Sequence, residues 1–316
     1  MMNHQIKQVG FTLLELMIAL ALGLIITAAA IQLILGSFIT TKLQDANGQI
    51  QEGGLFGLDY IVRDVQLLNF GNTNRYEMKS NTSGGGVVLS SSNITAETVN
   101  GISLSDLVTQ TNGLSNMDNI ESDQLTIQFV APTAMFNCEG VSVRAGDLII
   151  QRYYLREDNS QLSLVCDSNT PSPLKVREHV DGENEPQEVD NPPQNRPKII
   201  NGLGTSPQVI IPRVDQFKVL LGGMDSSGNL AYYDIETFKT EADLKVVALK
   251  LSVLVRSESV VSNQNVDPTQ NFNLFGINDL TNFSGQLSDQ DATNQIPRQV
   301  YIATVALRNG LGNNDE

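Results

Sequence analysis

The hydrophobic pattern divides the chain into one long apolar segment near the amino terminus and a remainder in which short apolar runs alternate with polar ones. Residues 11–39 hold 22 apolar side chains in 29 positions and one charged residue, Glu15. A helix of this segment would be about 43 Å long, which exceeds the hydrocarbon core of a bilayer, about 30 Å. The pattern therefore predicts one membrane-spanning helix.

The helix is expected to continue through residues 40–69 as an amphipathic helix, because apolar residues recur there at spacings of three and four. These positions are Leu55, Leu58, Val62, Val65 and Leu68. Four glycines occur in the same region: Gly48, Gly53, Gly54 and Gly57. Each costs a helix about 1 kcal/mol relative to alanine, so we expect a bend or a locally unwound turn at this point.

Alternating apolar and polar positions predict strands in the rest of the chain. Residues 124–131 and the hairpin of residues 147–166 give the clearest pattern in its first half, with Leu125, Ile127 and Phe129 on one face of the former. Residues 70–121 and 262–295 are rich in polar residues, and we expect short strands and long surface loops in the former and a long loop in the latter.

Two further strands are expected in the carboxyl-terminal third. The first has the pattern of a central strand, with Val247, Leu249, Leu251, Val253 and Val255 on one face. The second is the last strand of the chain, with Tyr301, Ala303, Val305 and Leu307 on one face. Together these elements predict an α+β fold in which the amino-terminal helix packs on an antiparallel sheet.

Composition and charge exclude several classes of function. The chain has 316 residues and a net charge of -15, which opposes contact with a nucleic-acid backbone, and no direct nucleic-acid binding is predicted. Two cysteines and two histidines are too few for a usual zinc or iron–sulfur site, and we expect no cofactor. His179 has no nucleophilic partner that spacing identifies, so we expect no enzymatic activity. The acidic residues 178–193 do not match a calcium-loop pattern, and a solvated loop is the simpler interpretation, although calcium binding stays open.

The two cysteines, Cys138 and Cys166, are 28 residues apart. In an exported domain two cysteines most often form a disulfide, and closure of such a loop contributes about 3.5 kcal/mol in the chain-entropy model. The alternative is a pair of buried or reactive thiols.

Glu15 distinguishes the apolar segment from a plain membrane anchor or from a signal peptide cleaved near Ala28, Ala29 and Ala30. A carboxylate in a membrane helix costs about 2.5 to 3.5 kcal/mol and is kept where it has a partner. Cleavage between Gly10 and Phe11 would create a positive amine about 6 Å along the axis from Glu15, one helical turn away.

The sequence GFTLLEL at residues 10–16, after a short leader with Lys7, resembles the class III leader of type IV pilins and pseudopilins. The resemblance implies that a prepilin peptidase cuts after Gly10 and methylates the new amino terminus, Phe11. It also implies that Glu15 pairs with the amine of a neighbouring subunit, although pairing within its own chain stays open. The division expected is a leader at 1–10, a membrane and assembly helix at 11–39, its amphipathic continuation at 40–69, and a β-rich periplasmic domain at 70–316.

The order IIPRVDQFKVLLG, VVALKLSVLVRSES and TVALRNG, together with the RYYLR and LSLVCD hairpin, is similar to minor pilins of the PilW type. The resemblance implies a type IV pilin-like fold and a structural subunit, first held in the inner membrane with its domain in the periplasm and then placed near the tip of an extracellular pilus. Implied partners are other minor pilins, the major pilin, the prepilin peptidase, the inner-membrane assembly platform and a large tip adhesin. A minor pseudopilin of a type II secretion system is the first alternative, and a membrane-anchored adhesin or binding module is the second.

Overall fold

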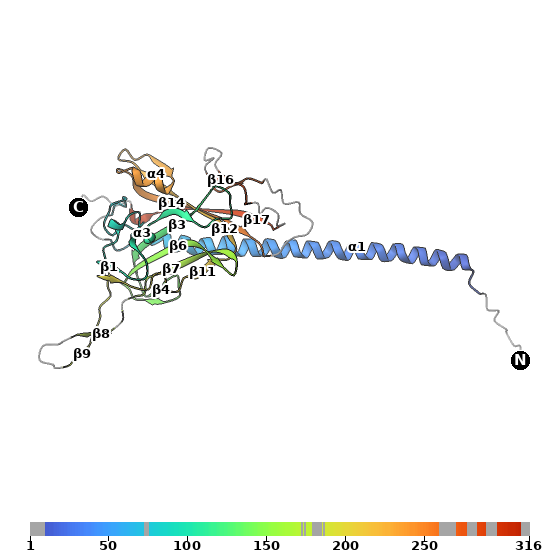
Figure 1. The fold of residues 1–316 in the computed structure, drawn as a ribbon, viewed down its shortest axis with the longest axis horizontal. Coiled ribbons are helices and arrows are strands. Elements are labelled where there is room, and N and C mark those ends of the chain that lie inside the picture. The colour runs from blue at the N-terminus through green and yellow to red at the C-terminus, as the bar shows by residue number, and fades with distance from the viewer. Residues whose placement is uncertain are drawn as a thin grey trace.

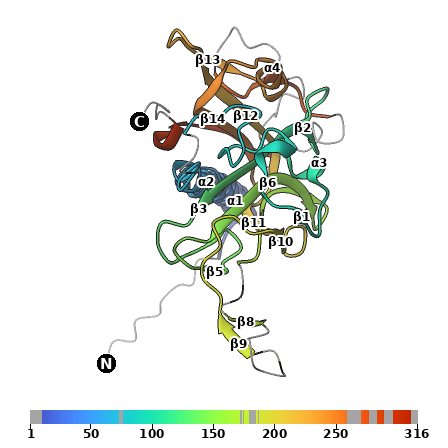
Figure 2. The ribbon, with the colours of Figure 1, turned by 90° about the vertical axis from the view of Figure 1, so that its left-hand side faces the viewer.

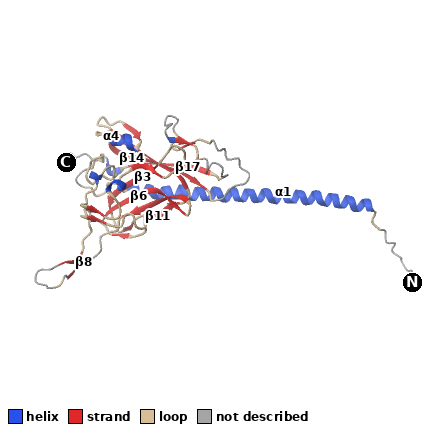
Figure 3. Cartoon of the chain, in the orientation of Figure 1, coloured by secondary structure: helices blue, strands red, loops and turns tan. Residues whose placement is uncertain are grey.

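A computed structural model of the chain describes residues 10–72, 76–171, 173, 175–178, 185, 187–258, 270–276, 283–288 and 296–310. One long helix projects from a body built mainly of strands (Figures 1 and 3). In this part of the chain, Leu13–Gln66 is the one helix long and apolar enough to cross a membrane, as the hydrophobic pattern predicted.

The helix has three parts: α1 (Leu13–Gln51), a π-helical turn η1 (Glu52–Phe56) and α2 (Gly57–Gln66). The first buried residue is Ala46, so about 50 Å of helix precedes the body at 1.5 Å per residue. The glycine-rich region thus interrupts regular α-helical winding, as expected, but the backbone stays helical throughout.

Two antiparallel sheets make up the body. The five-stranded sheet has the spatial order β11 (Gln208–Ile211), β7 (Gln161–Ser168), β6 (Leu148–Asp158), β3 (Ser122–Val130) and β2 (Gln110–Gly113). The four-stranded sheet has the order β13 (Leu230–Tyr233), β12 (Val214–Met224), β14 (Lys245–Arg256) and β17 (Arg298–Ala306). The expected hairpin is β6 and β7, and the expected central strand is β14.

The two sheets meet where the start of β3 lies beside β12. Asp123 on β3 accepts a hydrogen bond of 2.7 Å from the backbone N–H of Val219 and pairs with Lys218 at 2.5 Å. The helix lies between the sheets and contacts their outer strands, β11 and β17, through α2 (Figure 2). The body therefore closes around the carboxyl-terminal part of the helix.

Short elements lie around the two sheets. Those in residues 70–121 include short strands, as expected, and also two short helical segments that were not expected. Between the helix and β6 the short elements are η2 (Ser91–Asn93), β1 (Thr98–Val99), α3 (Leu104–Leu107), β4 (Met135–Phe136) and β5 (Ser142–Val143). Beyond β7 they are β8 (Lys175–Glu178), β9 (Gln187–Asp190), β10 (Ile199–Ile200), α4 (Ile235–Thr240), β15 (Phe272–Asn273), β16 (Ser284–Gly285) and η4 (Arg308–Gly310). The described parts of residues 262–295 pair as β15 and β16 over a small apolar cluster, so this segment is more than the loop expected.

The main core buries Leu58 and Val65 of α2 and Leu68 just after it, as predicted, with Val62 partly buried. Leu55, however, is 60% exposed, and Ile61 is fully buried in its place on the core face. An ordinary α-helix already places Leu55 about 120° around the axis from Ile61, because each residue advances by about 100°. Leu55 therefore lies at the edge of the apolar face and Ile61 near its middle.

A phase shift occurs in β14. The register moves between Gly222 and Gly223, which pair with Ala248 and Val246, so Val247 is the extra residue of a β-bulge. Val246, rather than the predicted Val247, belongs to the main core. The other predicted residues of this strand, Leu249, Leu251, Val253 and Val255, are buried in that core. In the last strand Val305 is buried, Tyr301 and Ala303 are partly buried against the core, and Leu307, directly after the strand, is buried as well, which confirms that face.

Candidate functional site: the amino-terminal helix and its anchorage

The helix begins with a capping box formed by Thr12 and Glu15. The Thr12 hydroxyl accepts from the Glu15 N–H at 3.3 Å, and the Glu15 carboxylate accepts from the Thr12 N–H at 3.0 Å and from the Thr12 hydroxyl at 3.1 Å. The T-x-x-E pattern that signals such a box is present in the sequence, although Glu15 was predicted as a functional residue from its charge alone. Among the residues that the structure describes, no basic side chain is paired with Glu15.

The helix surface before Ala46 is almost wholly exposed apolar side chain. Phe11 is 88% exposed and Phe38 is 60% exposed, and the leucines and isoleucines between them are similarly uncovered. An apolar surface of this extent is not stable in water, and it needs either lipid or other apolar helices as its surroundings. The arrangement is therefore suited to a bilayer and to lateral helix packing.

Close packing at the π turn anchors the helix to the body. A Cβ atom placed on Gly54 would lie 2.3 Å from the Tyr301 ring of β17, and one placed on Gly57 would lie 2.4 Å from Ile211 of β11. Both contacts depend on the absence of a side chain on the helix. The glycines that the sequence analysis associated with a bend thus allow the edge strands of both sheets to approach the helix axis.

A buried polar contact joins α2 to β6. The Tyr153 hydroxyl donates to Asp64 at 2.6 Å and also lies 3.1 Å from the side-chain oxygen of Gln151. Burial raises the pKa of Asp64 to about 6, against the lowering effect of the hydrogen bonds from Tyr153 and Gln151. Sequence reasoning missed this contact, since only the polar residue on the apolar side of α2 hinted at it.

The predicted disulfide is present. Cys138 and Cys166 are bonded, with a Cα–Cα distance of 6.1 Å, and both are buried. The bond joins the loop after β4 to β7, next to the Glu139 carboxylate, which accepts from the Ser168 N–H at 3.0 Å. Burial raises the pKa of Glu139. The expected disulfide is therefore confirmed, and it ties the loop after β4 to β7.

Metal chemistry finds no support in the described residues, where no group of three or more His, Cys, Asp or Glu side chains could hold an ion. The acidic segment 178–193 includes β9, which pairs with β8. His179 lies outside the described residues, together with residues 180–184 and 186. The structure therefore does not test calcium binding in this segment.

Two family profiles match the chain. The family profile described as Type IV Pilus-assembly protein W matches residues 152–309, half of the chain. The chain belongs to this family. A second profile, the prokaryotic N-terminal methylation motif, matches residues 7–31, which include Gly10, Phe11 and Glu15. No curated protein and no solved structure matches the chain.

These matches identify a type IV pilus-related pilin. The PilW match covers most of the β6 and β7 hairpin and all of the four-stranded sheet, and the methylation motif covers the start of the projecting helix. The family is a structural component of pilus assembly and not an enzyme family. The exposed apolar helix is the part of the molecule suited to membrane anchoring and to incorporation into a pilus.

Proposed function

We propose that this chain is a minor pilin, a subunit that helps to initiate fibre assembly and occupies a position near the pilus tip. The observation that carries the proposal is the projecting helix, which exposes apolar side chains along about 50 Å while the body buries only its far end. Such a helix can leave the bilayer only where other apolar helices cover it. The large body and its membership of the PilW family favour a specialised subunit of the pilus over a pseudopilin.

Processing is the first step of the proposed function. A prepilin peptidase cuts after Gly10 and methylates the amine of Phe11. The capping box then gains a new role, because the carboxylate that accepts from Thr12 lies one turn from the positive amine of Phe11. In the assembled fibre we assign the partner of Glu15 to the amine of a neighbouring subunit, which sets the register between helices.

Location and partners follow from the same proposal. The chain is first an inner-membrane protein with its body in the periplasm, consistent with Lys7 on the cytoplasmic side. The assembly platform then transfers it into the fibre, where it contacts other minor pilins, the major pilin and a large tip adhesin. The domain boundaries 1–10, 11–39, 40–69 and 70–316 are assigned on this basis.

Sequencing of the amino terminus of the membrane-extracted protein tests the processing step. We expect a methylated Phe11 as the first residue, and Gly10→Val should leave the leader attached. Gly23→Ala is a matched control, because Gly23 has open space around it in the same helix. A start at Met1 in the unaltered protein, or one near Ile31, would contradict the proposal.

Deletion of the chain tests the assembly role. We expect few surface pili in a deletion strain and restoration by the full chain, with protein secretion unchanged. A secretion defect with normal piliation would instead indicate a pseudopilin. Normal piliation and secretion with loss of surface attachment would indicate an anchored adhesin. Gold labelling of a tagged chain should place the label at fibre ends rather than along their length.

A further inference from the structure

The two main sheets of the body end in four edge strands: β2 and β11 in the five-stranded sheet, and β13 and β17 in the four-stranded sheet. β2, β11 and β13 have 4 residues each, and the pairing of β2 and of β11 also contains a register shift. Short strands and bulges are devices by which proteins prevent a further strand from pairing with an edge. These three edges are therefore protected.

The fourth edge strand, β17, lacks both devices. It has 9 residues and pairs with β14 in one unbroken register, from Arg298 opposite Arg256 to Ala306 opposite Ala248. Residues 299–306 include no proline and no charged residue. A long, regular and uncharged edge of this kind readily accepts another strand.

The pairing with β14 shows which backbone groups of β17 face outward. At one end the Leu307 N–H donates to the Val247 oxygen at 2.9 Å, and at the other the Ser257 N–H donates to the Pro297 oxygen at 3.1 Å. In an antiparallel pair, alternate residues direct both backbone groups toward the partner strand. The odd-numbered residues of β17 therefore face β14. The residues that face away from it are Arg298, Val300, Ile302, Thr304 and Ala306.

The outward groups lie on an uncovered part of the surface. Ile302 is 43% exposed, and Thr304 and Ala306 are exposed as well. The Val300 oxygen accepts from the Gln299 side chain at 3.2 Å. Within the described chain, the backbone N–H and C=O groups of Ile302 and Thr304 make no hydrogen bond. This edge therefore presents donors and acceptors in the alternation that a further strand would satisfy.

β17 runs alongside the helix and in the same direction. The Tyr301 ring lies against Gly54 in the π turn, and Asn309, just after the strand, accepts from Asn69, just after the helix, at 2.9 Å. Figure 1 shows the strand close to the point where the helix leaves the body. Antiparallel pairing of this edge with the same edge of a second copy would reverse every direction along the strand. The two helices would then point in opposite directions, which one bilayer does not permit.

A groove of about 390 Å³ lies between the start of β17 and the helix. Its lining includes Gln51 and Leu55 of the helix and Gln299 and Tyr301 of the strand. Leu55 is 60% exposed at this place. Alternate side chains of a strand added to β17 would point toward the helix and could cover Leu55. The edge is thus continuous with the exposed apolar surface of the helix.

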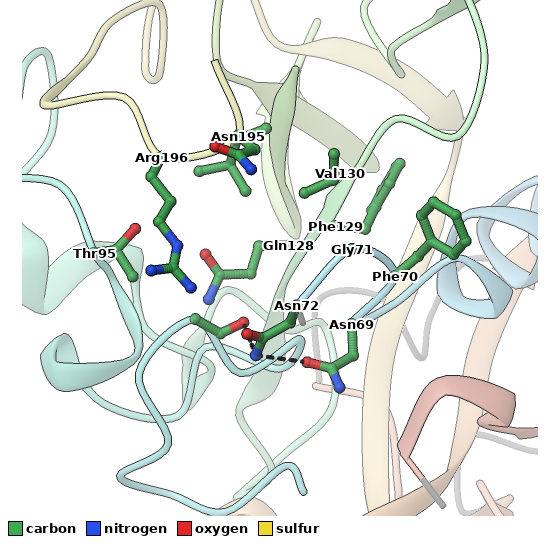
Figure 4. Close-up of a pocket in the computed structure, with 12 residues that line it drawn as sticks. Asn69, Phe70, Gly71, Asn72, Thr95, Gln128, Phe129, Val130, Asn195 and Arg196 are labelled. Atoms are coloured by element: carbon green, nitrogen blue, oxygen red, sulfur yellow. Dashed lines mark hydrogen bonds between the residues drawn. The ribbon is translucent and has the colours of Figure 1, made fainter. Parts of the chain in front are cut away.

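The polar cavity of about 270 Å³ in Figure 4 is a weaker candidate for a binding site. Its amide side chains are bonded within the chain: Asn72 donates to Asn69 at 3.2 Å, and Gln128 donates to the Gly85 oxygen at 2.7 Å. These bonds join the segments around the cavity to one another, so we assign them a structural role.

We propose that the outer edge of β17 binds an extended strand of a different, neighbouring pilin subunit, which pairs with it and enlarges the four-stranded sheet. The partner strand accepts from the N–H groups of Ile302 and Thr304 and donates to their oxygens. Because the edge is uncharged, an uncharged strand rich in β-branched residues fits it best. The inference rests on the minor-pilin function proposed above, since packing of the helices brings such a neighbour alongside.

Ile302→Lys tests the pairing, because a lysine on an edge strand opposes the addition of another strand. Leu230→Lys is the matched control. Leu230 lies on β13, the protected edge of the same sheet, and is 52% exposed against 43% for Ile302. Each variant is expressed in the deletion strain. We expect Ile302→Lys to give as few surface pili as the deletion itself, and Leu230→Lys to restore the normal number.

Normal piliation with Ile302→Lys, or equal loss with both variants, would overturn the pairing and leave the minor-pilin function in place. Normal piliation in the deletion strain itself would overturn that function, and the pairing with it. The two failures are therefore distinguishable.

A cross-link gives a test that does not depend on the stability of the lysine variant. The photoreactive residue p-benzoylphenylalanine is placed at Thr304 in piliated cells, and at Ser227, in the exposed turn after β12, as the control. We expect a cross-link from position 304, but not from position 227, to another pilin, identified by mass spectrometry. A cross-link to a second copy of this chain, or no cross-link from position 304, would overturn the proposal.

Discussion

The carboxylate of Asp64 on the helix and the hydroxyl of Tyr153 on β6 form a hydrogen bond of 2.6 Å in the core. Asp64 is 9% exposed and Tyr153 is fully buried. The contact ties the last turns of the helix to a central strand of the five-stranded sheet. Burial raises the pKa of Asp64 to about 6, and it also raises the pKa of Tyr153, with the charge of Asp64 as the next cause.

The burial of Asp64 predicts that the body loses stability as the pH rises from about 4 to about 6. In that range the folded Asp64 holds a proton that the unfolded side chain, with its ordinary pKa of 3.8, has already released. Stability falls where the folded state binds more protons, and the shift from 3.8 to about 6 corresponds to about 3 kcal/mol. Chemical denaturation of the full chain in detergent, from pH 4 to pH 7, measures the effect.

Asp64→Asn is the control for this pH dependence. Its amide oxygen can still accept from Tyr153 but does not titrate, so the contribution of this group to the slope should disappear. The same slope in Asp64→Asn and in the unaltered protein would assign the effect to other carboxylates.

Gly54→Ala should destabilise the body by about 1 to 3 kcal/mol, the usual cost of overpacking. The reason is the Tyr301 ring, which would lie 2.3 Å from the added methyl group. Gly53→Ala is the matched control, because its nearest neighbour, Ile211, lies 3.7 Å from the added atom. This second change should be neutral or stabilise the helix by up to about 1 kcal/mol. Equal effects of the two changes in a denaturation experiment would mean that helix propensity, not contact with β17, decides the outcome.

Replacing both cysteines, Cys138→Ser with Cys166→Ser, should cost about 3.5 kcal/mol of unfolding free energy in the chain-entropy model for a 28-residue loop. Denaturation midpoints of the variant and of the unaltered protein, with and without reductant, measure this difference. Reductant should lower the midpoint of the unaltered protein only. An unchanged midpoint in the double variant would show that the buried contacts alone hold the loop to β7.

Glu15→Ala should leave membrane insertion and leader processing largely intact but reduce the number of surface pili strongly. Thr12→Ala separates the two roles of the carboxylate, since it removes the hydroxyl of the capping box at a cost of about 1 kcal/mol but keeps the charge of Glu15. If Glu15 acts through the register between subunits, piliation should survive in Thr12→Ala and fail in Glu15→Ala. Normal piliation in Glu15→Ala would refute the register argument.

The sequence allowed the long strands and the helix to be predicted, because their apolar residues follow a constant period over many positions. The β6 and β7 hairpin and the central position of β14 are examples. One error occurred where a residue breaks the period, at the bulge that displaces Val247, and another at Leu55, which lies at the edge of the apolar face of the helix. The bulge depends on the pairing of β14 with Gly222 and Gly223 of β12, and a local pattern does not contain these partners.

The residues of the candidate site also fall into those with a local signal in the sequence and those without one. The leader pattern and the two cysteines have fixed local or compositional signals. The methylation-motif match and the disulfide agree with them, and the roles of Gly10, Phe11 and Glu15 stay predictions. The Asp64 contact and the outer edge of β17 depend on segments that only the folded chain brings together, Asp64 with Tyr153, 89 positions apart, and β17 with β14.

The π turn at Glu52–Phe56 sets how far the body is rotated about the helix axis relative to the apolar half of the helix. Each residue of an α-helix advances by about 100° around the axis, so one residue more or fewer between the apolar half and the anchored half turns one against the other by nearly a third of a revolution. In the fibre proposed above, such a change would turn the sheets of the body to face a different direction around the fibre axis. In this chain a single turn of backbone thus fixes the rotation of the body relative to the apolar half of its helix.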